Sequence, residues 1–353
     1  MKKFLIVLVC FLLLYQNNSR AQNMSSEDSV KIDKSFYFYR GSLPGAMVCV
    51  LDHGKEVYSQ ISGLANNDTK EKLTRDHLFY MSSVSKIFTS MAIFQLIEMD
   101  KLSLDESIKD LYPELPEYTS NVKIKNLLSH TSGLVNYDKE KIKNRKELLS
   151  FLSEQDSLRF EAGTSWNYSN TDYILLAGII EKKSKKSYKK FVKKEVFKKI
   201  HINKNQFYDE IADDLIVNGH NEKASWNYTL ATEPNDRILG ERGVYLSLDD
   251  LIKTENAIFQ NKIISPEYSK SFNRFINHNG VNINYGYSWY IVPQDKDNPD
   301  KTIYWIGGRN DGFQNVIVHF PEQKVSVLLF INRDKTYYSL VKTAVEIGKL
   351  YIQ

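Results

Sequence analysis

Tyr80-Met81-Ser82-Ser83-Val84-Ser85-Lys86 contains a serine three residues before a lysine. It leads into an apolar segment, residues 87–97, that is predicted to be a helix. A serine at a helix start lies beside unpaired amide groups and the positive end of the helix dipole, which favour developing negative charge. Lys86, three residues after Ser83, lies on the same helix face. The stretch therefore predicts Ser83 as a nucleophile with Lys86 as its base, and a plain helix cap at Ser83 is the alternative.

The same Ser-x-x-Lys spacing recurs at Ser120 to Lys123 and at Ser187 to Lys190, so the spacing alone does not identify a site. A lysine accepts a proton only when it is neutral, and burial under an apolar helix lowers the pKa of its amine. Lys190 lies in a basic run, where it is expected to stay hydrated and charged. The apolar neighbours of Lys86 therefore favour the first site.

The chain begins with a segment that is typical of a secretory signal. Two lysines precede the apolar run 4–15, and Ser19 and Ala21 are the small residues expected before a cleavage site. About a dozen apolar residues is fewer than the roughly 20 that a membrane-spanning helix needs. We expect cleavage after Ala21, no stable membrane span afterwards, and export to the periplasm or the extracellular space. An uncleaved anchor is the alternative.

Charge and cysteine content narrow the classes of partner. Removal of residues 1–21 lowers the formal net charge from +4 to +1, which gives no reason to expect nucleic acid as a partner. Cys49 then remains alone, in an apolar stretch where burial is expected, so no disulfide forms within the chain. The histidines lack metal-binding spacing, and we expect neither a metal nor another cofactor. The sequence does not indicate an oligomeric state.

A basic run lies between Lys182 and Lys199, where ten lysines are interleaved with apolar residues at helical spacing. This pattern predicts one amphipathic helix whose exposed face is basic. Binding of that face to an anionic polymer or a lipid surface is the alternative to a merely solvated surface.

Strand patterns lie at the two ends of the chain. Residues 46–51 and 56–62 alternate as a β-hairpin, and three further strand-like runs occupy residues 302–306, 313–320 and 324–331. The segment between them is mostly helical by periodicity. We therefore predict an α/β fold in which an antiparallel sheet is built from both termini and closed by a helix over 337–351. The predicted domain spans 22–353, with a sheet lobe at 36–82 and 259–353, an inserted helical lobe at 83–258, and a ligand cleft between them.

Three motifs occur in order along this chain: Tyr80 to Lys86, Leu128-Ser129-His130-Thr131-Ser132-Gly133-Leu134, and Tyr168-Ser169-Asn170. Further pieces include Gly243-Val244-Tyr245-Leu246-Ser247 and Tyr285-Gly286-Tyr287-Ser288-Trp289. Together they resemble the serine β-lactamase and penicillin-binding-protein superfamily, in particular its class C-like branch. The resemblance spans nearly the whole mature chain and implies a β-lactamase/transpeptidase-like fold.

The resemblance also implies roles for four residues. Ser83 would attack a carbonyl and form an acyl-enzyme, and Lys86 would accept its proton. Tyr168 resembles the second-motif tyrosine, which relays a proton to the leaving group, and Asn170 resembles the asparagine that holds Lys86 and a substrate carbonyl. His130 is expected to be a structural residue of its loop.

The third motif departs from the family pattern. The family places Lys-Thr-Gly or His-x-Gly on a strand that lines the cleft, whereas this chain reads Tyr304-Trp305-Ile306-Gly307-Gly308-Arg309-Asn310-Asp311-Gly312-Phe313. Either Ile306 or Trp305 takes the place of the missing basic residue, and the Trp305 alignment resembles esterases of the superfamily. Arg309 is a candidate replacement cation, and backbone amides of Ser83 and of the segment 307–309 are candidates for an oxyanion hole.

These features predict an exported serine hydrolase that cleaves an ester or a small amide of a small-molecule or peptide substrate. A D-alanyl-D-alanine peptidase and a β-lactamase are alternatives within the same chemistry, but both substrates carry a carboxylate that requires a cationic partner. An inactive, ligand-binding member of the superfamily is the alternative from another class.

Overall fold

The structure is a computed structural model. It describes residues 32, 44–138, 141–202, 206–210, 215–220, 228–229, 238–260, 262–263, 265, 269, 276–278, 281–294, 301–310, 312–333 and 337–352. The predicted signal segment, residues 1–21, lies outside the described residues.

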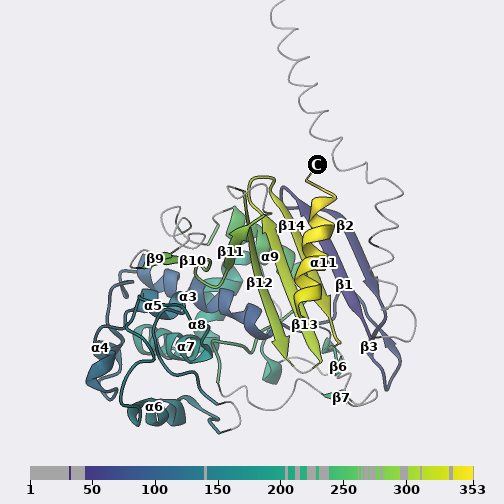
Figure 1. The fold of residues 1–353 in the computed structure, drawn as a ribbon. Coiled ribbons are helices and arrows are strands. Elements are labelled where there is room, and N and C mark those ends of the chain that lie inside the picture. The colour runs from purple at the N-terminus through teal and green to yellow at the C-terminus, as the bar shows by residue number, and fades with distance from the viewer. Residues whose placement is uncertain are drawn as a thin grey trace, which may run out of the picture.

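A six-stranded antiparallel sheet forms the centre of the fold, with the strand order β11-β12-β13-β14-β1-β2 (Figure 1). Its strands are β1 (Ala46–Asp52), β2 (Lys55–Ser62), β11 (Tyr290–Pro293), β12 (Thr302–Asn310), β13 (Phe313–Phe320) and β14 (Val325–Ile331). β1 pairs with β14, from Ala46 opposite Ile331 to Asp52 opposite Val325, so strands from the two ends of the chain meet. The predicted sheet is thereby confirmed, and β11 is the strand that the sequence analysis missed.

Alternation along β1 explains why this strand lies inside the sheet. Met47 and Cys49 belong to the core beneath the helical part of the chain, whereas Ala46 and Val48 belong to the core on the opposite face. A strand that is buried on both faces reads as a continuous apolar run, and β1 and β14 both do so. The turn from β1 to β2 has positive φ at His53 (52°) and at the following glycine (77°), as a tight hairpin requires.

Helices surround the sheet on both faces. The α-helices are α3 (Lys86–Glu98), α4 (Ile108–Leu111), α5 (Ile124–Leu128), α6 (Arg145–Ser153), α7 (Asn170–Ser184), α8 (Tyr188–Val192), α9 (Leu248–Phe259) and α11 (Tyr337–Lys349). Short 3-10 or π turns are η3 (Ser82–Ser85), η4 (Glu117–Thr119), η5 (Lys193–Phe197), η6 (Lys198–Ile200) and η7 (Tyr208–Glu210). Small strand pairs are formed by β3 (Leu64–Asn66) with β4 (Glu71–Lys72), β5 (Phe79–Tyr80) with β8 (Tyr245–Leu246), β6 (Gly219–His220) with β7 (Tyr228–Thr229), and β9 (Ile276–His278) with β10 (Val281–Ile283).

The two faces of the sheet have separate cores. α11 covers one face, where it packs on β13 and β14 (Figure 1). The other face packs against the larger core, which contains α3 and α7. Every residue of α3 from Lys86 to Ile97 is buried, so this helix is the central element of the helical part. No helix in the described part of the chain is long and apolar enough to cross a membrane.

The basic run does not form the single helix that its periodicity predicted. α7 ends at Ser184, and Lys185 adopts a left-handed conformation with φ of 57°. Ser187 then starts α8, where its side chain accepts a hydrogen bond from the backbone amide of Lys190. The apolar residues of the run are buried as expected, because α8 and η5 pack on α3. The prediction failed at the break because a left-handed residue leaves no mark in hydrophobic periodicity.

Candidate active site

Ser83 lies in the turn that joins the sheet side of the molecule to α3. The short strand β5 ends at Tyr80, and η3 then carries Ser83 before α3 begins at Lys86. Met81 donates a backbone hydrogen bond of 2.9 Å to Val244, which fixes the start of the turn. Val84 and its neighbours are buried, whereas Ser83 is partly exposed. The turn therefore keeps the Ser83 hydroxyl partly accessible and buries the other residues of η3.

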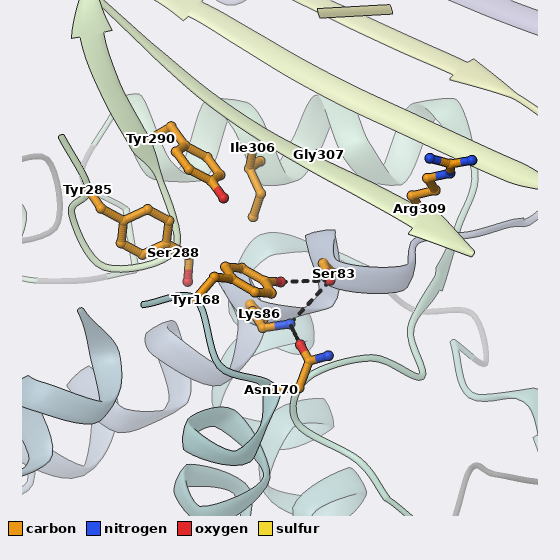
Figure 2. A pocket seen from close by; sticks show the side chains of 10 residues that line it. All are labelled: Ser83, Lys86, Tyr168, Asn170, Tyr285, Ser288, Tyr290, Ile306, Gly307 and Arg309. Atoms are coloured by element: carbon orange, nitrogen blue, oxygen red, sulfur yellow. Dashed lines mark hydrogen bonds between the residues drawn. The ribbon is translucent and has the colours of Figure 1, made fainter. Parts of the chain in front are cut away.

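The four residues with predicted roles in the reaction lie next to one another (Figure 2): Ser83, Lys86, Tyr168 and Asn170. Lys86 Nζ lies 3.2 Å from Ser83 Oγ and 2.8 Å from Asn170 Oδ1. Tyr168 donates its hydroxyl proton to Ser83 Oγ over 2.9 Å. Ser83 and Asn170 are separated by most of the helical part, so only the packing of α3 on α7 brings them together.

Loop contacts position the second-motif residues. The turn after α5 and the loop before α7 are joined by backbone hydrogen bonds from Gly163 to Thr131 (2.8 Å) and from Asn167 to His130 (3.0 Å). Asn136 Oδ1 accepts the backbone amide of Asn170 at 2.9 Å, which satisfies one of the unpaired amides at the start of α7. These contacts fix the backbone on both sides of Tyr168.

The environment of Lys86 makes it suited to proton transfer. Its side chain is 1% exposed, and this burial lowers its pKa to about 8, although Glu241 opposes the shift. Asn170 Oδ1 and the backbone carbonyl of Glu241, at 2.8 and 3.1 Å, can only accept hydrogen bonds. A neutral amine has two hydrogens and one lone pair, so these two acceptors take the hydrogens. The lone pair is then left for the hydroxyl of Ser83.

Tyr168 has a raised pKa, whereas the pKa of Lys86 is lowered. Loss of solvent around its hydroxyl raises the pKa of Tyr168, and Ser83 opposes this shift only in part. The phenol is therefore protonated at neutral pH and donates to Ser83 Oγ. Of the two groups in contact with Ser83, Lys86 is the better base at rest.

The third-motif segment forms one wall of the site. β11 pairs with residues 302–305 of β12, and within the described residues no further strand pairs with residues 306–310 on that side. Ile306, Gly307 and Arg309 line a cavity of about 440 Å³ together with Ser83 and the second-motif residues. Figure 2 shows Ile306 over the cavity and Arg309 further along the strand.

Trp305 and Gly308, two further residues of the predicted site, do not line this cavity. Trp305 stacks on Tyr290, with ring centroids 4.1 Å apart. Gly308 packs on η3, where a Cβ atom would lie 2.2 Å from the carbonyl oxygen of Met81. Of the two alignments of the third motif, the cavity therefore favours the one that places Ile306 at the position of the missing cation.

Sequence reasoning missed three further residues that line the cavity. Tyr285, Ser288 and Tyr290 line the cavity, and the rings of Tyr285 and Tyr290 meet edge to face at 4.9 Å. The signal was present in the motif from Tyr285 to Trp289, which supported the resemblance without being assigned to the site. Tyr290 belongs to β11, the strand that was not predicted.

His130 lies directly behind Tyr168. It is completely buried, and its ring centroid lies 4.5 Å from that of Tyr168. His130 Nδ1 lies 3.3 Å from the backbone amide of Ser169 and 3.1 Å from Asp172 Oδ2. Burial raises the pKa of Asp172 well above its usual range, so we expect its carboxyl to be protonated and to share this proton with His130.

Among the described residues, no three His, Cys, Asp or Glu side chains gather in a way that would hold a metal ion. Among the described residues, Lys86 and Arg309 are the charged groups that line the cavity, and Glu241 with Arg242 lies beside Lys86. The arrangement provides a hydroxyl with a buried amine at 3.2 Å and a phenol at 2.9 Å, which is the set of groups that acyl transfer needs.

Known proteins share this arrangement of elements. A model of the β-lactamase family matches residues 26–348. Penicillin-binding protein 4* of Bacillus subtilis (strain 168) is 28% identical over 316 residues, which cover 82% of this chain and 68% of that protein. The chain spans about two thirds of the length of the curated relatives that it matches.

Two solved structures show the same fold. A class C β-lactamase matches with a TM-score of 0.74 at 22% identity, over 86% of this chain and 90% of that chain. The D-amino acid amidase from Ochrobactrum anthropi SV3 matches with a TM-score of 0.73 at 18% identity, over 94% and 98%. Because the family model covers nearly the whole described chain, the protein belongs to the β-lactamase family, whose superfamily of serine hydrolases includes the penicillin-binding proteins.

Proposed function

We propose that this protein is an exported hydrolase that cleaves uncharged esters or small amides through an acyl-enzyme on Ser83. The observation that carries the proposal is the position of Lys86 Nζ, 3.2 Å from Ser83 Oγ, with its other two close partners restricted to accepting hydrogen bonds. A positioned base of this kind is what turns a serine hydroxyl into a nucleophile.

The proposed reaction has two steps. In the first, Ser83 Oγ bonds to the substrate carbonyl carbon and its proton passes to Lys86. The bond to the leaving group then breaks as Tyr168 supplies a proton to the departing oxygen or nitrogen, and the proton on Lys86 replaces it. In the second, water adds to the acyl-enzyme and loses a proton to the same groups, which releases a carboxylic acid and restores the Ser83 hydroxyl. Asn170 holds Lys86 during both steps.

The backbone of β12 supplies the second half of the proposed oxyanion hole. The carbonyl of Arg309 accepts a hydrogen bond from Ser82 Oγ, so it faces η3 and not β13. In an extended strand, the amide and the carbonyl of one residue point to the same side. The amide of Arg309 therefore points toward η3, and together with the amide of Ser83 it would stabilise the negative oxygen of the tetrahedral intermediate.

The walls of the cavity favour uncharged acyl groups. Ile306 is apolar and buried, and the rings of Tyr285 and Tyr290 also line the cavity. A substrate carboxylate in this space would lose solvent without gaining a cationic partner from the third-motif position. The solved D-amino acid amidase supports an amide as one form of the scissile bond.

A second candidate is hydrolysis of a substrate that carries a carboxylate, such as a β-lactam or a D-alanyl-D-alanine peptide. The observation in its favour is Arg309, which lines the cavity. The name penicillin-binding protein 4* of the Bacillus relative points in the same direction.

Intact-mass analysis after exposure to a neutral fluorophosphonate and, separately, to a labelled penicillin tests the proposal. We expect the phosphonate adduct on the wild type and none on Ser83→Ala. Ser187→Ala is the matched control, because Ser187 caps α8 and should lose about 1 kcal/mol of stability but no labelling. Labelling by penicillin in preference to the phosphonate would favour the second candidate. Absence of any adduct on a folded protein would favour an inactive, ligand-binding member.

A further inference from the structure

A buried charge pair, Glu241 and Arg242, lies beside Lys86 and does not line the cavity. Glu241 Oε2 lies 3.6 Å from Lys86 Nζ, and Glu241 is 5% exposed. Arg242 Nε lies 2.6 Å from Glu241 Oε1, and this guanidinium is 14% exposed. Glu241 and Arg242 precede β8, the short strand that pairs with β5 just before η3. The pair therefore belongs to the same framework that holds the Ser83 turn.

Tyr137 fixes the carboxylate of Glu241 in this position. Its hydroxyl donates to Glu241 Oε1 over 3.0 Å and accepts a hydrogen bond of 2.6 Å from Arg242. Tyr137 thus bridges the carboxylate of Glu241 and the guanidinium of Arg242, while Glu241 Oε2 lies 3.6 Å from Lys86 Nζ. A buried carboxylate that is held on both sides keeps its distance from the lysine, so its electrostatic effect on Lys86 is constant.

Other titratable groups face Lys86 from every element around it. Tyr173 of α7 and Tyr168 place their rings 5.5 and 5.0 Å from Nζ. Asp172 of α7 and His130 of the turn after α5 are also electrostatically coupled to Lys86, but Asp172 shares its proton with His130. Glu241 is the only one of these groups that forms an ion pair with Lys86 among the described residues.

Glu241 and Arg242 act on Lys86 in opposite directions. Burial lowers the pKa of Lys86, the carboxylate of Glu241 raises it, and the guanidinium of Arg242 lowers it again. The base needs both effects, because full desolvation alone would prevent Lys86 from holding the proton that it takes from Ser83, and an unopposed carboxylate would keep Lys86 protonated at rest.

We propose that Glu241 and Arg242 form a built-in control of the base, with Glu241 as the positioning residue that holds the Lys86 ammonium formed during acylation and Arg242 as its opposing charge. The inference rests on the proposed function, in which Lys86 accepts the proton of Ser83. No bond forms at Glu241, and neither Glu241 nor Arg242 exchanges a proton with Ser83, Lys86 or Tyr168. The pair instead decides the pH at which Lys86 becomes available.

The test is the pH dependence of the rate constant for fluorophosphonate labelling of Ser83. Lys86 must be neutral to act, so the rate rises with pH through its pKa. Glu241→Gln removes the charge that stabilises the ammonium, and we expect the midpoint to move to lower pH by about one unit or more. Arg242→Gln removes the opposing charge, and we expect the midpoint to move to higher pH. Arg242→Lys keeps the charge and should stay close to the wild type.

The opposite directions separate electrostatic control from a structural role, because local damage lowers the plateau rate without moving the two midpoints apart. Glu255→Gln is the matched control, since Glu255 is a buried glutamate beside His319, outside the cavity lining, and the midpoint should not change. Unchanged midpoints, or shifts of both variants in one direction, would overturn the inference. If Glu241→Gln does not fold, an unshifted Arg242→Gln midpoint overturns it alone. Failure of the wild type to label would instead contradict the proposed function.

Discussion

Ser82 Oγ donates a hydrogen bond of 2.9 Å to the backbone carbonyl of Arg309, which ties the residue before the candidate nucleophile to β12. Ser82 adopts a positive φ of 47°, an uncommon conformation for serine. Gly308 lies against the same turn, because its α-carbon packs on the carbonyl of Met81. The distance between η3 and β12, and with it the proposed oxyanion hole, therefore depends on a small set of close contacts.

Gly308→Ala should separate β12 from η3. A Cβ atom at this position would lie 2.2 Å from a backbone oxygen, so either the strand or the turn must move. Overpacking of this kind costs about 1–3 kcal/mol, and we expect a loss of that size together with slower phosphonate labelling. Chemical denaturation and labelling kinetics measure the two effects. Ser82→Ala removes only the hydrogen bond and should cost about 0.5–1.5 kcal/mol. Wild-type stability and labelling in Gly308→Ala would show that the contact is not needed.

Labelling of the wild type should increase as the pH rises through about 8, the pKa to which burial lowers Lys86. Below that pH the amine is protonated and cannot take the proton of Ser83. Lys86→Ala should lose about 100-fold to 10,000-fold in rate, as expected when a positioned base is removed. Lys86→Arg should lose as much, because a guanidinium does not deprotonate. Stopped-flow labelling across pH 6 to 10 gives the profile, and an active arginine variant would identify another base.

Substrate preference should depend on Ile306. We expect the ratio of kcat/KM for a neutral nitrophenyl ester to that for a chromogenic cephalosporin to be high in the wild type. Ile306→Lys places a cation at the cavity and should lower this ratio by improving the cephalosporin. Trp305→His is the matched control, because Trp305 stacks on Tyr290 and does not line the cavity. A wild-type preference for the cephalosporin that disappears in Arg309→Ala would assign the role of the missing cation to Arg309.

Asp172→Asn should increase stability at neutral pH. The pKa of Asp172 is raised in the folded protein, so the unfolded chain releases this proton at lower pH and native stability falls as pH rises above about 4. An asparagine amide can donate to His130 and accept from Ser132 as the protonated carboxyl does, without this loss. Denaturation at pH 4 and pH 7.5 should show a larger benefit at the higher pH. A variant that is less stable at both would mean that Asp172 is ionised in the native state.

Local patterns in the sequence were enough for most of the fold. The apolar runs of β1 and β14 and the continuous apolar face of α3 predicted these elements, and the resemblance carried by the ordered motifs predicted their assembly. Two local features were lost. β11 has four residues, too few for a clear alternation, and the break at Lys185 depends on one left-handed residue inside an otherwise helical pattern.

The sequence by itself determined that Lys86 lies beside Ser83, because a spacing of three residues on a helix puts both side chains on one face. It also favoured Tyr168 and Asn170, through motifs that stand in a set order. Only the tertiary structure showed that Ile306 and not Trp305 lines the cavity, since a shift of one residue along a strand turns a side chain to the opposite face. Only the tertiary structure placed Glu241 behind Lys86, 155 positions away along the chain. Electrostatic control of a buried amine depends on distances between segments that are remote in sequence, and neither periodicity nor spacing records those distances.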